Sequence, residues 1–271
     1  MAVPFDSASE ERRCRLTTEL YDYEFFPWRI DGDRRIVADE GEWDAIRKRG
    51  RNGRKARVRV PVDVFEEAGK AKVYNRDGHQ LFISSHGGWS VEETRNPWVL
   101  TCDVVSCLYG IVDEFPNLTW MLETERPENV AEMKPPTPVY ESATTGEMLP
   151  YWGPNKVERP NLWLYARCDT QAEADARIPH LLRCPAVVRG LVMEPREDVN
   201  LALVLGGAEE SRSVQNGWHG IDHVIIRGGT EPLHPDNVRS IVRQCEAAGV
   251  PVWCESPVDG RVVKQLPEAK S

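Results

Sequence analysis

The sequence has no long apolar run and no leader-like beginning. No stretch approaches the roughly 18 consecutive apolar residues that a membrane-spanning helix needs. The first residues, MAVPFDSASEERRCRL, lack the apolar core of a signal peptide. These absences predict a cytoplasmic protein that has no membrane partner.

Cysteine and histidine patterns that bind metals are also missing. The seven cysteines are an odd number and no two have C-x-x-C spacing, so we expect reduced thiols rather than a disulfide framework. The closest pair, Cys102 and Cys107, lies in an apolar stretch with a helical pattern, where buried thiols are more common than metal ligands. The six histidines do not form a ligand set either. We therefore predict no metal ion and no cofactor.

Diagnostic phosphate-binding and catalytic motifs are absent around the most conspicuous turn. The pair Gly228-Gly229 follows an apolar run, but it belongs to neither a G-x-G-x-x-G nor a Walker pattern. A triad of Ser85, His234 and Asp169 lacks the G-x-S-x-G nucleophile elbow. No short motif therefore identifies the protein as a dinucleotide-binding protein or a serine hydrolase.

Positive charge is concentrated in one segment of an acidic chain. The formal net charge is -9 at pH 7, which argues against the whole molecule coating nucleic acid. Residues 47–59 nevertheless hold eight Arg or Lys among thirteen residues, without interleaved aromatic residues. Such a cluster predicts contacts with a nucleic-acid backbone, and the alternative is a solvated loop or an internal partner for the acidic surface. The candidate residues for nucleic-acid contacts are Arg47, Arg49, Arg51, Arg54 and Lys55.

Apolar runs predict buried strands, chiefly in the second half of the chain. The runs are continuous rather than alternating, which is the pattern of strands buried on both faces of a parallel sheet. Two further candidates lie upstream. The six predicted strands cover residues 79–85, 117–123, 161–166, 186–193, 222–227 and 250–254.

Amphipathic segments with helix caps separate several of these strands. In one segment Asp169 or Thr170 is a candidate N-cap. In another, Pro235 lies in the first turn and Gly249 provides the stop. The three clearest helical segments cover residues 96–115, 169–184 and 234–250.

The alternation of strands and helices predicts an α/β fold with a parallel sheet. One possibility is an open doubly wound sheet, and the other is a TIM-barrel-like parallel (β/α) barrel, either partial or complete. The six recognisable strands fit an incomplete barrel slightly better. We expect the barrel-like domain over residues 61–271 and an N-terminal extension, which includes the basic segment, over residues 1–60.

Polar residues follow several predicted strands, at the edge where such folds place their functional groups. Arg167 is a candidate grip for a carboxylate or phosphate, and Glu194 and Asp169 are candidate catalytic acid/base residues. The alternative is an ion-pair network that closes the barrel mouth. The same choice applies to the other candidate ligand-binding residues, which are Glu123, Thr124, Arg126, Arg227, Gly228, Gly229 and Thr230.

Two long segments are similar to a known family. NLWLYARCDTQAEADARIPHLLRCPAVVRGLVMEP (161–195) and GIDHVIIRGGTEPLHPDNVRSIVRQCEAAGVPVW (220–253) resemble the phage- and prophage-encoded gp-thirty-seven/gp-sixty-eight proteins. The family patterns are approximately AD-RIP-LL--PA-VRF-S-EPLL and MHPDWVR-LRDQC-AAGVPFFFKQ. LTWMLETERPENV (118–130) is similar to the family's LLLTKRPE segment. The resemblance covers roughly residues 80–256 and implies a radical-SAM-type partial barrel.

The departures from the family pattern fall on the strand ends. The resemblance implies an N-terminal GC-KVS-GC-NCYAE motif with three thiolates for an iron–sulfur cluster, but the first 60 residues hold only Cys14. The family's lysine in LTKRP is Glu125 here, and Arg167 and Arg227 replace small or different residues. The scaffold strings are retained while the pocket residues differ, so we expect no iron–sulfur cluster.

The preferred hypothesis is a phage- or prophage-type barrel protein. It would bind an anionic small molecule or a nucleotide at the carboxyl ends of its strands, and whether it is an enzyme is left open. One alternative is a non-catalytic accessory protein that binds nucleic acid through the basic segment. A second alternative is a radical-SAM-like enzyme whose cluster ligands are supplied otherwise, for example by a partner chain.

Overall fold

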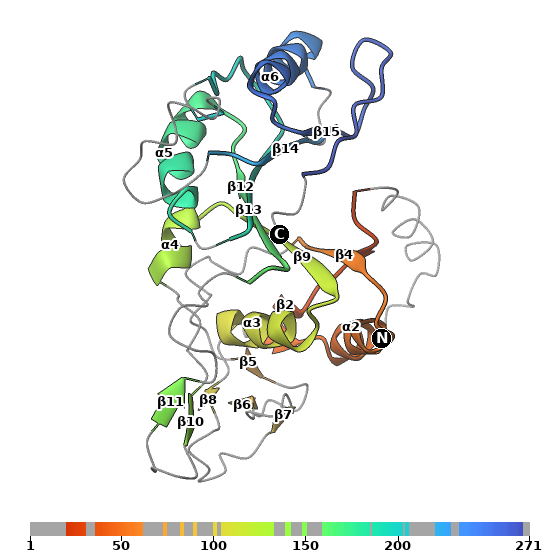
Figure 1. The fold of residues 1–271 in the computed structure, drawn as a ribbon, viewed down its shortest axis with the longest axis vertical. Helices are drawn as coiled ribbons and strands as arrows, with labels where there is room; N and C mark the ends of the chain where they lie inside the picture. Colours follow the sequence, from red (N-terminus) through yellow and green to blue (C-terminus); the bar gives the residue numbers. More distant parts are fainter. Residues whose placement is uncertain are drawn as a thin grey trace, which may run out of the picture.

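The computed structural model describes most of the predicted barrel domain and part of what precedes it. Helices pack against one large sheet, and smaller sheets lie beside it (Figure 1). The described residues are 20–30, 36–61, 73–74, 82–83, 89–90, 100–101, 104–132, 139–141, 148–150, 159–184, 186–202, 204–205, 220–228 and 233–267.

The main sheet has seven strands, and every neighbouring pair is parallel. Spatial order follows chain order, and the sheet is curled into a half-barrel (Figure 1). Among the described residues no pairing joins the two edge strands, so the sheet is open. The strands are β1 (Tyr23–Glu24), β4 (Ala56–Val60), β9 (Leu118–Thr124), β12 (Leu162–Arg167), β13 (Val188–Met193), β14 (His223–Ile226) and β15 (Val252–Cys254).

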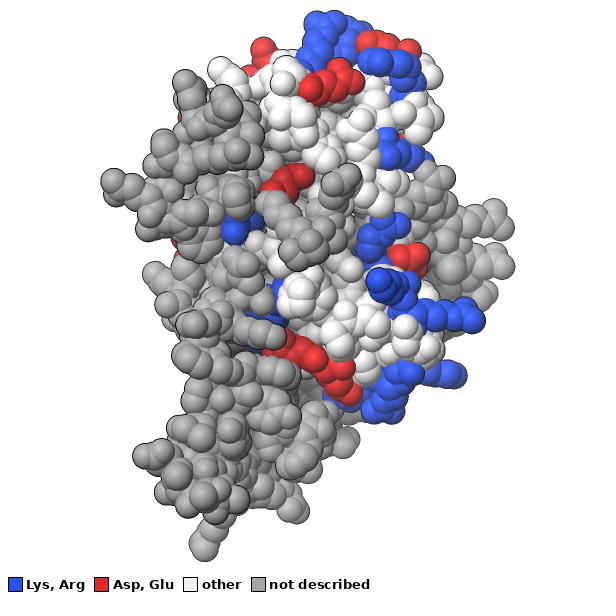
Figure 2. Space-filling model, in the orientation of Figure 1, with Lys and Arg blue, Asp and Glu red and all other residues white. Residues whose placement is uncertain are grey.

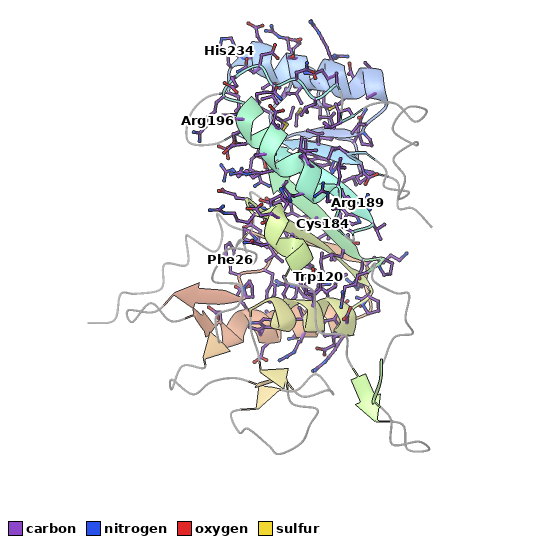
Figure 3. All side chains as sticks on the ribbon, turned by 90° about the vertical axis from the view of Figure 1, so that its left-hand side faces the viewer. Phe26, Trp120, Cys184, Arg189, Arg196 and His234 are labelled. Carbon is purple, nitrogen blue, oxygen red and sulfur yellow. The ribbon has the colours of Figure 1, made fainter. Side chains whose placement is uncertain are left out.

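Helices cover one face of this sheet. The larger apolar core contains residues from every described helix, and Trp120 of β9 lies within it above α2 and α3 (Figure 3). The predicted caps are confirmed, because Thr170 begins α5 with a capping box and Gly249 ends α6 with a φ of 69°. The helices are α2 (Glu40–Arg51), α3 (Val104–Glu114), α4 (Pro127–Glu132), α5 (Gln171–Leu181) and α6 (Pro235–Ala248). None of these described helices is sufficiently long and apolar to cross a bilayer.

The opposite, concave face of the sheet carries a second apolar cluster without helical residues. Tyr165, Trp163 and Trp253 belong to it. The side chain of His223 is buried beside Tyr165, and the two rings are 5.8 Å apart. The concave side of the half-barrel therefore holds a mixed cluster of aromatic and aliphatic side chains, and a group of charged residues lies at its rim.

The region predicted as an N-terminal extension contributes two strands to the main sheet. β1 and β4 pair with each other, and β4 also pairs with β9. The domain boundary predicted after residue 60 falls between β4 and β9, which pair in one sheet, and it stays a prediction. The sequence does not predict the strands β1 and β4, because β1 has only two residues and β4, ARVRV, alternates arginine with small apolar side chains.

The predicted strand at residues 79–85 is not part of the parallel sheet. Its described residues form β6 (Phe82–Ile83), which pairs antiparallel with β7 (Trp89–Ser90) and β8 (Leu100–Thr101). The start of β8 also shortens the helix predicted at 96–115 to α3, because apolar residues alone do not mark where a strand gives way to a helix. Two more small sheets contain β2 (Trp28–Ile30), β3 (Ile36–Ala38) and β5 (Val73–Tyr74), and β10 (Val139–Glu141) and β11 (Met148–Pro150).

Candidate functional site

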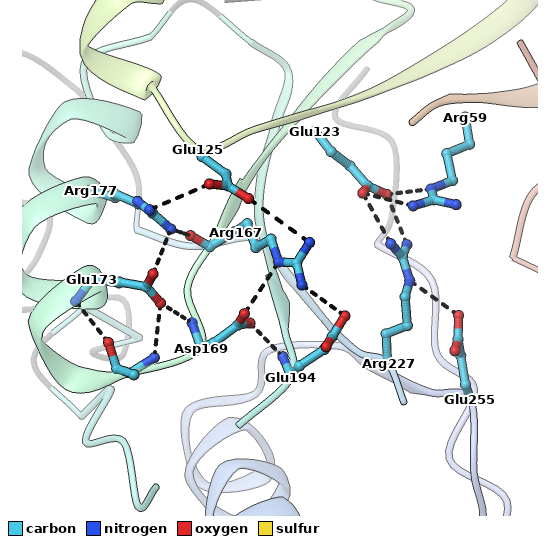
Figure 4. A network of polar contacts seen from close by, with 11 residues as sticks. Arg59, Glu123, Glu125, Arg167, Asp169, Glu173, Arg177, Glu194, Arg227 and Glu255 are labelled. Atoms are coloured by element: carbon cyan, nitrogen blue, oxygen red, sulfur yellow. Dashed lines mark hydrogen bonds and ion pairs between the residues drawn. The ribbon is translucent and has the colours of Figure 1, made fainter. Parts of the chain in front are cut away.

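Charged side chains gather where the strands of the main sheet end. Because all strand pairs are parallel, the carboxyl ends lie along one edge, which we call the rim. Most of the rim residues are drawn in Figure 4. The charged residues in the last two positions of a strand, or directly after it, are Glu24, Arg59, Glu123, Glu125, Arg167, Glu194, Arg227 and Glu255.

Glu123 is held by two arginines from different strands (Figure 4). Arg59 donates to both carboxylate oxygens over 2.7 and 3.0 Å, and Arg227 donates to both over 3.0 and 2.8 Å. The three side chains are only 13 to 15% exposed. Burial by itself raises the pKa of Glu123, but the hydrogen bonds from Arg227 and Arg59 outweigh burial and lower it to about 2. Glu123 is therefore a fixed anion of the folded protein.

The same arginines extend this arrangement to both edges of the sheet. Arg59 Nη1 donates to Glu24 Oε1 over 2.6 Å, and Arg227 Nε donates to Glu255 Oε1 over 3.3 Å. We call the five residues Glu24, Arg59, Glu123, Arg227 and Glu255 the mouth clamp. Its contacts are those of the predicted ion-pair network, and a ligand-binding role for Glu123 and Arg227 stays a hypothesis.

The first glycine of the predicted anion-binding turn serves the protein's own carboxylate. The backbone N–H of Gly228 hydrogen bonds to Glu255. A Cβ at Gly228 would meet no atom within 4 Å, and its φ is not in the left-handed region. Neither conformation nor space therefore requires glycine at this position. Gly229 and Thr230 lie outside the described residues.

A second group of ion pairs centres on Arg167 (Figure 4). Its Nε donates to Asp169 Oδ2 over 3.2 Å, and its Nη2 donates to Glu194 Oε1 over 3.0 Å. Asp169 is buried, and its Oδ1 accepts a hydrogen bond from the backbone N–H of Glu194 over 2.8 Å. The structure thus brings the predicted residues Arg167, Asp169 and Glu194 together. Both carboxylates hold the arginine, and their predicted acid/base role stays a hypothesis.

Glu125 faces Arg167 and Arg177 at once. Both arginine-to-carboxylate distances are 3.9 Å, and the Glu125 side chain is 50% exposed. Arg177 lies closer to Glu173, at 3.4 Å, and also donates to the backbone carbonyl of Arg167. Of the carboxylates that form ion pairs with these two arginines, Glu125 lies at the longest distance.

These arginines line a pocket of about 260 Å³ beside the first turn of α5. Arg196 is exposed next to α5 (Figure 3), and its backbone N–H donates to the carbonyl of Asp169 over 3.1 Å. Its guanidinium forms no hydrogen bond or ion pair with any residue that the structure describes. The pocket is lined by Glu125, Arg167, Asp169, Thr170, Glu173, Arg177 and Arg196.

The N–H groups at the start of α5 are occupied by protein carboxylates. Glu173 Oε2 accepts from the backbone N–H groups of Asp169 and Thr170 over 2.8 and 3.2 Å. The N–H of Gln171 donates to Glu197 Oε1 over 2.7 Å. This helix terminus is thus already neutralised. Any affinity of the pocket for an anion depends on its arginine side chains.

Thr124 and Arg126, two of the predicted ligand-binding residues, do not line the pocket. Thr124 is buried, and its Oγ1 accepts a hydrogen bond from the backbone N–H of Arg126 over 2.8 Å. The Arg126 side chain is 60% exposed and lies 3.5 Å from Glu128. Thr124 therefore shapes the backbone after β9, and the Arg126 side chain points toward Glu128.

The basic segment forms the end of α2, a turn and β4, rather than one solvated loop. Arg47 Nε lies 3.8 Å from Glu114 Oε2, and the guanidinium of Arg49 lies 4.1 Å from the ring centre of Tyr23. The internal-partner alternative thus describes part of this segment. Contact with nucleic acid stays a hypothesis for the exposed part, which includes Arg51, Arg54 and Lys55.

Sequence reasoning does not identify Glu173, Arg177 and Arg196 as pocket residues. Their only sequence signal is position, because Glu173 and Arg177 lie four apart on the helix that follows Asp169, and Arg196 follows Glu194 by two residues. Loops after strands and first helical turns face the strand ends in parallel α/β folds. That rule would have nominated Arg196 and Glu173, but not Arg177, which lies beyond the first turn of α5.

The described cysteines do not suit the iron–sulfur cluster that the resemblance implies for the family. Cluster ligands must converge as thiolates. Burial raises the pKa of each described thiol to about 12, so the thiols stay protonated. In the described part of the chain no three His, Cys, Asp or Glu residues are grouped to hold a metal ion. The described cysteines are Cys168, Cys184, Cys245 and Cys254.

The fold and the rim define an α/β protein with an open, curled parallel sheet and a charged pocket at its strand ends. The chain belongs to the family described as protein of unknown function (DUF5131), whose sequence model matches residues 42–257. The matched region includes the pocket and every rim residue except Glu24. Neither a curated protein nor a solved structure matches the chain.

Proposed function

We propose that the protein binds a small molecule through a phosphate or carboxylate group, in the pocket beside α5. The observation that carries this proposal is the position of Glu125. Its carboxylate lies 3.9 Å from both Arg167 and Arg177, which is within ionic attraction but beyond a good hydrogen bond. An incoming anion that displaces Glu125 gains two guanidinium partners at short range.

The two arginines are oriented before the ligand arrives. Asp169 and Glu194 fix the guanidinium of Arg167, and Glu173 fixes that of Arg177. A ligand therefore meets cations whose side-chain entropy has already been lost on folding. The carboxylates that hold the arginines also keep the net charge of the pocket near zero. This charge balance favours a ligand anion that replaces a protein carboxylate over one that adds a further negative charge.

Arg196 supplies the additional positive charge. It is exposed at the pocket wall, and no described residue neutralises its guanidinium. Arginine binds carboxylate and phosphate groups with two parallel hydrogen bonds, so it is suited to recognise either group. We infer that Arg196 makes the first contact with the ligand and that Glu125 swings away.

In this proposal the half-barrel is a TIM-barrel-like scaffold of phage or prophage type that has lost cluster chemistry. The mouth clamp supports it, because Glu123 and its two arginines occupy the centre of the rim with fixed ion pairs. Ligand binding is then displaced to the pocket at α5. Asp169 and Glu194 orient Arg167 in this scheme and do not abstract a proton.

Calorimetric titration of the full chain with inorganic phosphate, acetate and a nucleoside monophosphate tests the proposal. Arg196→Gln is expected to weaken binding on the order of tenfold, the usual effect of losing one charged hydrogen bond. Glu125→Gln is expected to tighten binding, because it removes the competing anion. Arg126→Gln is the matched control and leaves binding unchanged, since Arg126 does not line the pocket.

The arms of the titration separate the possible ligands. Binding of phosphate and the monophosphate but not acetate identifies a phosphate site, and the reverse order identifies a carboxylate site. An absence of binding by both the parent protein and Glu125→Gln would leave the ion pairs with a structural role only, and the proposal would then be abandoned.

A further inference from the structure

Seven of the eight cations of residues 47–59 divide into two groups with different surroundings. The first group contacts other parts of the protein. Arg47 forms an ion pair with Glu114, Arg49 lies over the Tyr23 ring, and Arg59 belongs to the mouth clamp. A second group is exposed, and its side chains form no ion pair with any described residue. We call this second group, at the turn between α2 and β4, the basic turn. It consists of Lys48, Arg51, Arg54 and Lys55.

The basic turn has a defined geometry. The side-chain oxygen of Asn52 accepts a hydrogen bond from the N–H of Arg54 over 2.8 Å, and Gly53 has a φ of 71°. Asn117 Nδ2 donates to the carbonyls of Gly50 and Arg54 over 3.1 and 2.9 Å. These bonds tie the turn to the loop before β9. Its cations are therefore presented on a fixed backbone.

The end of α2 is also packed too closely to shift. A Cβ at Gly50 would lie 2.3 Å from the Phe115 ring. This close approach holds the last turn of α2, which carries Lys48 and Arg51, against the segment after α3. The basic turn is thus anchored at both of its ends.

The basic turn lies at the opposite end of the sheet from the pocket. It precedes β4, so it is at the amino ends of the parallel strands, whereas the pocket is at their carboxyl ends. Figure 2 shows Lys and Arg side chains over α2 and β4, along one side of the face that it draws. A partner on this surface would not compete with a ligand in the pocket.

We infer that the basic turn docks on the sugar–phosphate backbone of double-stranded nucleic acid. Four exposed cations within eight residues stand out in a chain of net charge -9. No aromatic or large apolar side chain lies among them, so the surface lacks the anchor that a protein interface or a membrane surface requires. A partner of uniform, repeated negative charge fits it best, and recognition is independent of base sequence.

Fluorescence anisotropy of a labelled 20-base-pair duplex, titrated with the full chain at several salt concentrations, tests the inference. If three or four phosphates are neutralised, the slope of log K against log[salt] is about -3 to -4. The variant Lys48→Gln/Arg51→Gln/Arg54→Gln/Lys55→Gln is expected to lose binding. Lys55→Gln alone is expected to reduce the slope by about 1.

The control variant removes the same charge from exposed positions outside the basic turn. If the inference holds, the control variant retains duplex binding with a nearly unchanged salt slope. An equal loss of binding in both variants would mean that only the net charge of the protein matters. Thermal unfolding of both variants confirms that they fold, since cations in the last turn of α2 also stabilise that helix. The control carries Arg126→Gln, Arg183→Gln, Arg243→Gln and Arg261→Gln.

Two outcomes overturn the inference outright. One is a parent protein that does not bind the duplex at about 50 mM salt, where phosphate contacts are strongest. The other is equal affinity for polyglutamate of matched charge, which would assign the surface to an acidic protein partner.

Discussion

Glu123 and Arg227 are 104 residues apart in the chain and form two hydrogen bonds of 2.8 and 3.0 Å. Their strands, β9 and β14, are separated in the sheet by β12 and β13. In a flat sheet three strand spacings of about 4.8 Å would place them some 14 Å apart. The pair therefore bridges the concave side of the curled sheet and ties its two halves together.

Removal of this bridge is expected to destabilise the fold. Arg227→Ala leaves Glu123 buried with Arg59 alone and removes the ion pair of Glu255 with Arg227. We expect the free energy of unfolding to fall by about 3 kcal/mol, the cost of breaking a buried ion pair from one side. Urea denaturation measures this change. Arg126→Ala, which removes an exposed arginine, is expected to change it by less than about 0.5 kcal/mol.

The fold was predictable to the extent that its strands are apolar runs. β9, β12, β13 and β14 have long buried segments with clear caps or turns beside them, so the sequence predicts them well. The strand β4 was not predicted, because Arg57 and Arg59 alternate with small apolar residues and were interpreted as part of the basic segment. The convergence of Glu123 and Arg227 was not predictable, because it depends on sheet curl, which no local pattern encodes.

The mouth clamp makes the stability of the protein depend on pH in the acid range. The pKa of Glu123 is about 2 in the folded protein against 4.5 as its ordinary value. A lowered carboxyl pKa contributes stability that is complete above pH 4.5 and is lost as pH falls toward 2. The loss amounts to about 3 kcal/mol. Urea midpoints at pH 6, 4 and 3 should show it, and Glu123→Gln should show a shallower decline between pH 5 and 3.

His223 adds a second pH dependence at a higher pH. Its Nε2 lies 3.0 Å from the carbonyl of Gln265, which can only accept, so Nε2 carries the proton and Nδ1 accepts from Tyr165 over 2.9 Å. Burial lowers the pKa of His223 to about 4. The unfolded chain takes up the proton first, so stability is complete above pH 6.5 and declines toward pH 4.

The decline caused by His223 is separable from that of the mouth clamp. His223→Gln is expected to lower stability at pH 7 but to flatten the curve of unfolding free energy between pH 6.5 and 4. His234→Gln replaces a side chain that is 66% exposed and should leave the curve unchanged. An identical curve for His223→Gln and the parent protein would remove His223 as the cause.

The row Tyr165, Gly190 and His223 tests how tightly the concave face is packed. These residues are register partners on β12, β13 and β14. A Cβ at Gly190 would lie 2.2 Å from the Tyr165 ring and 2.9 Å from the carbonyl oxygen of His223, and the backbone oxygen cannot move away cheaply. Gly190→Ala should therefore cost about 2 kcal/mol of unfolding free energy.

Gly228→Ala meets nothing within 4 Å and serves as the glycine control, with a change of less than about 0.5 kcal/mol. Equal, small effects of the two substitutions would mean that Tyr165 can leave its place, and that the concave face could open for a ligand. A large effect at Gly190 alone would mean that the packing of the concave face is rigid and that the proposed ligand site is confined to the rim.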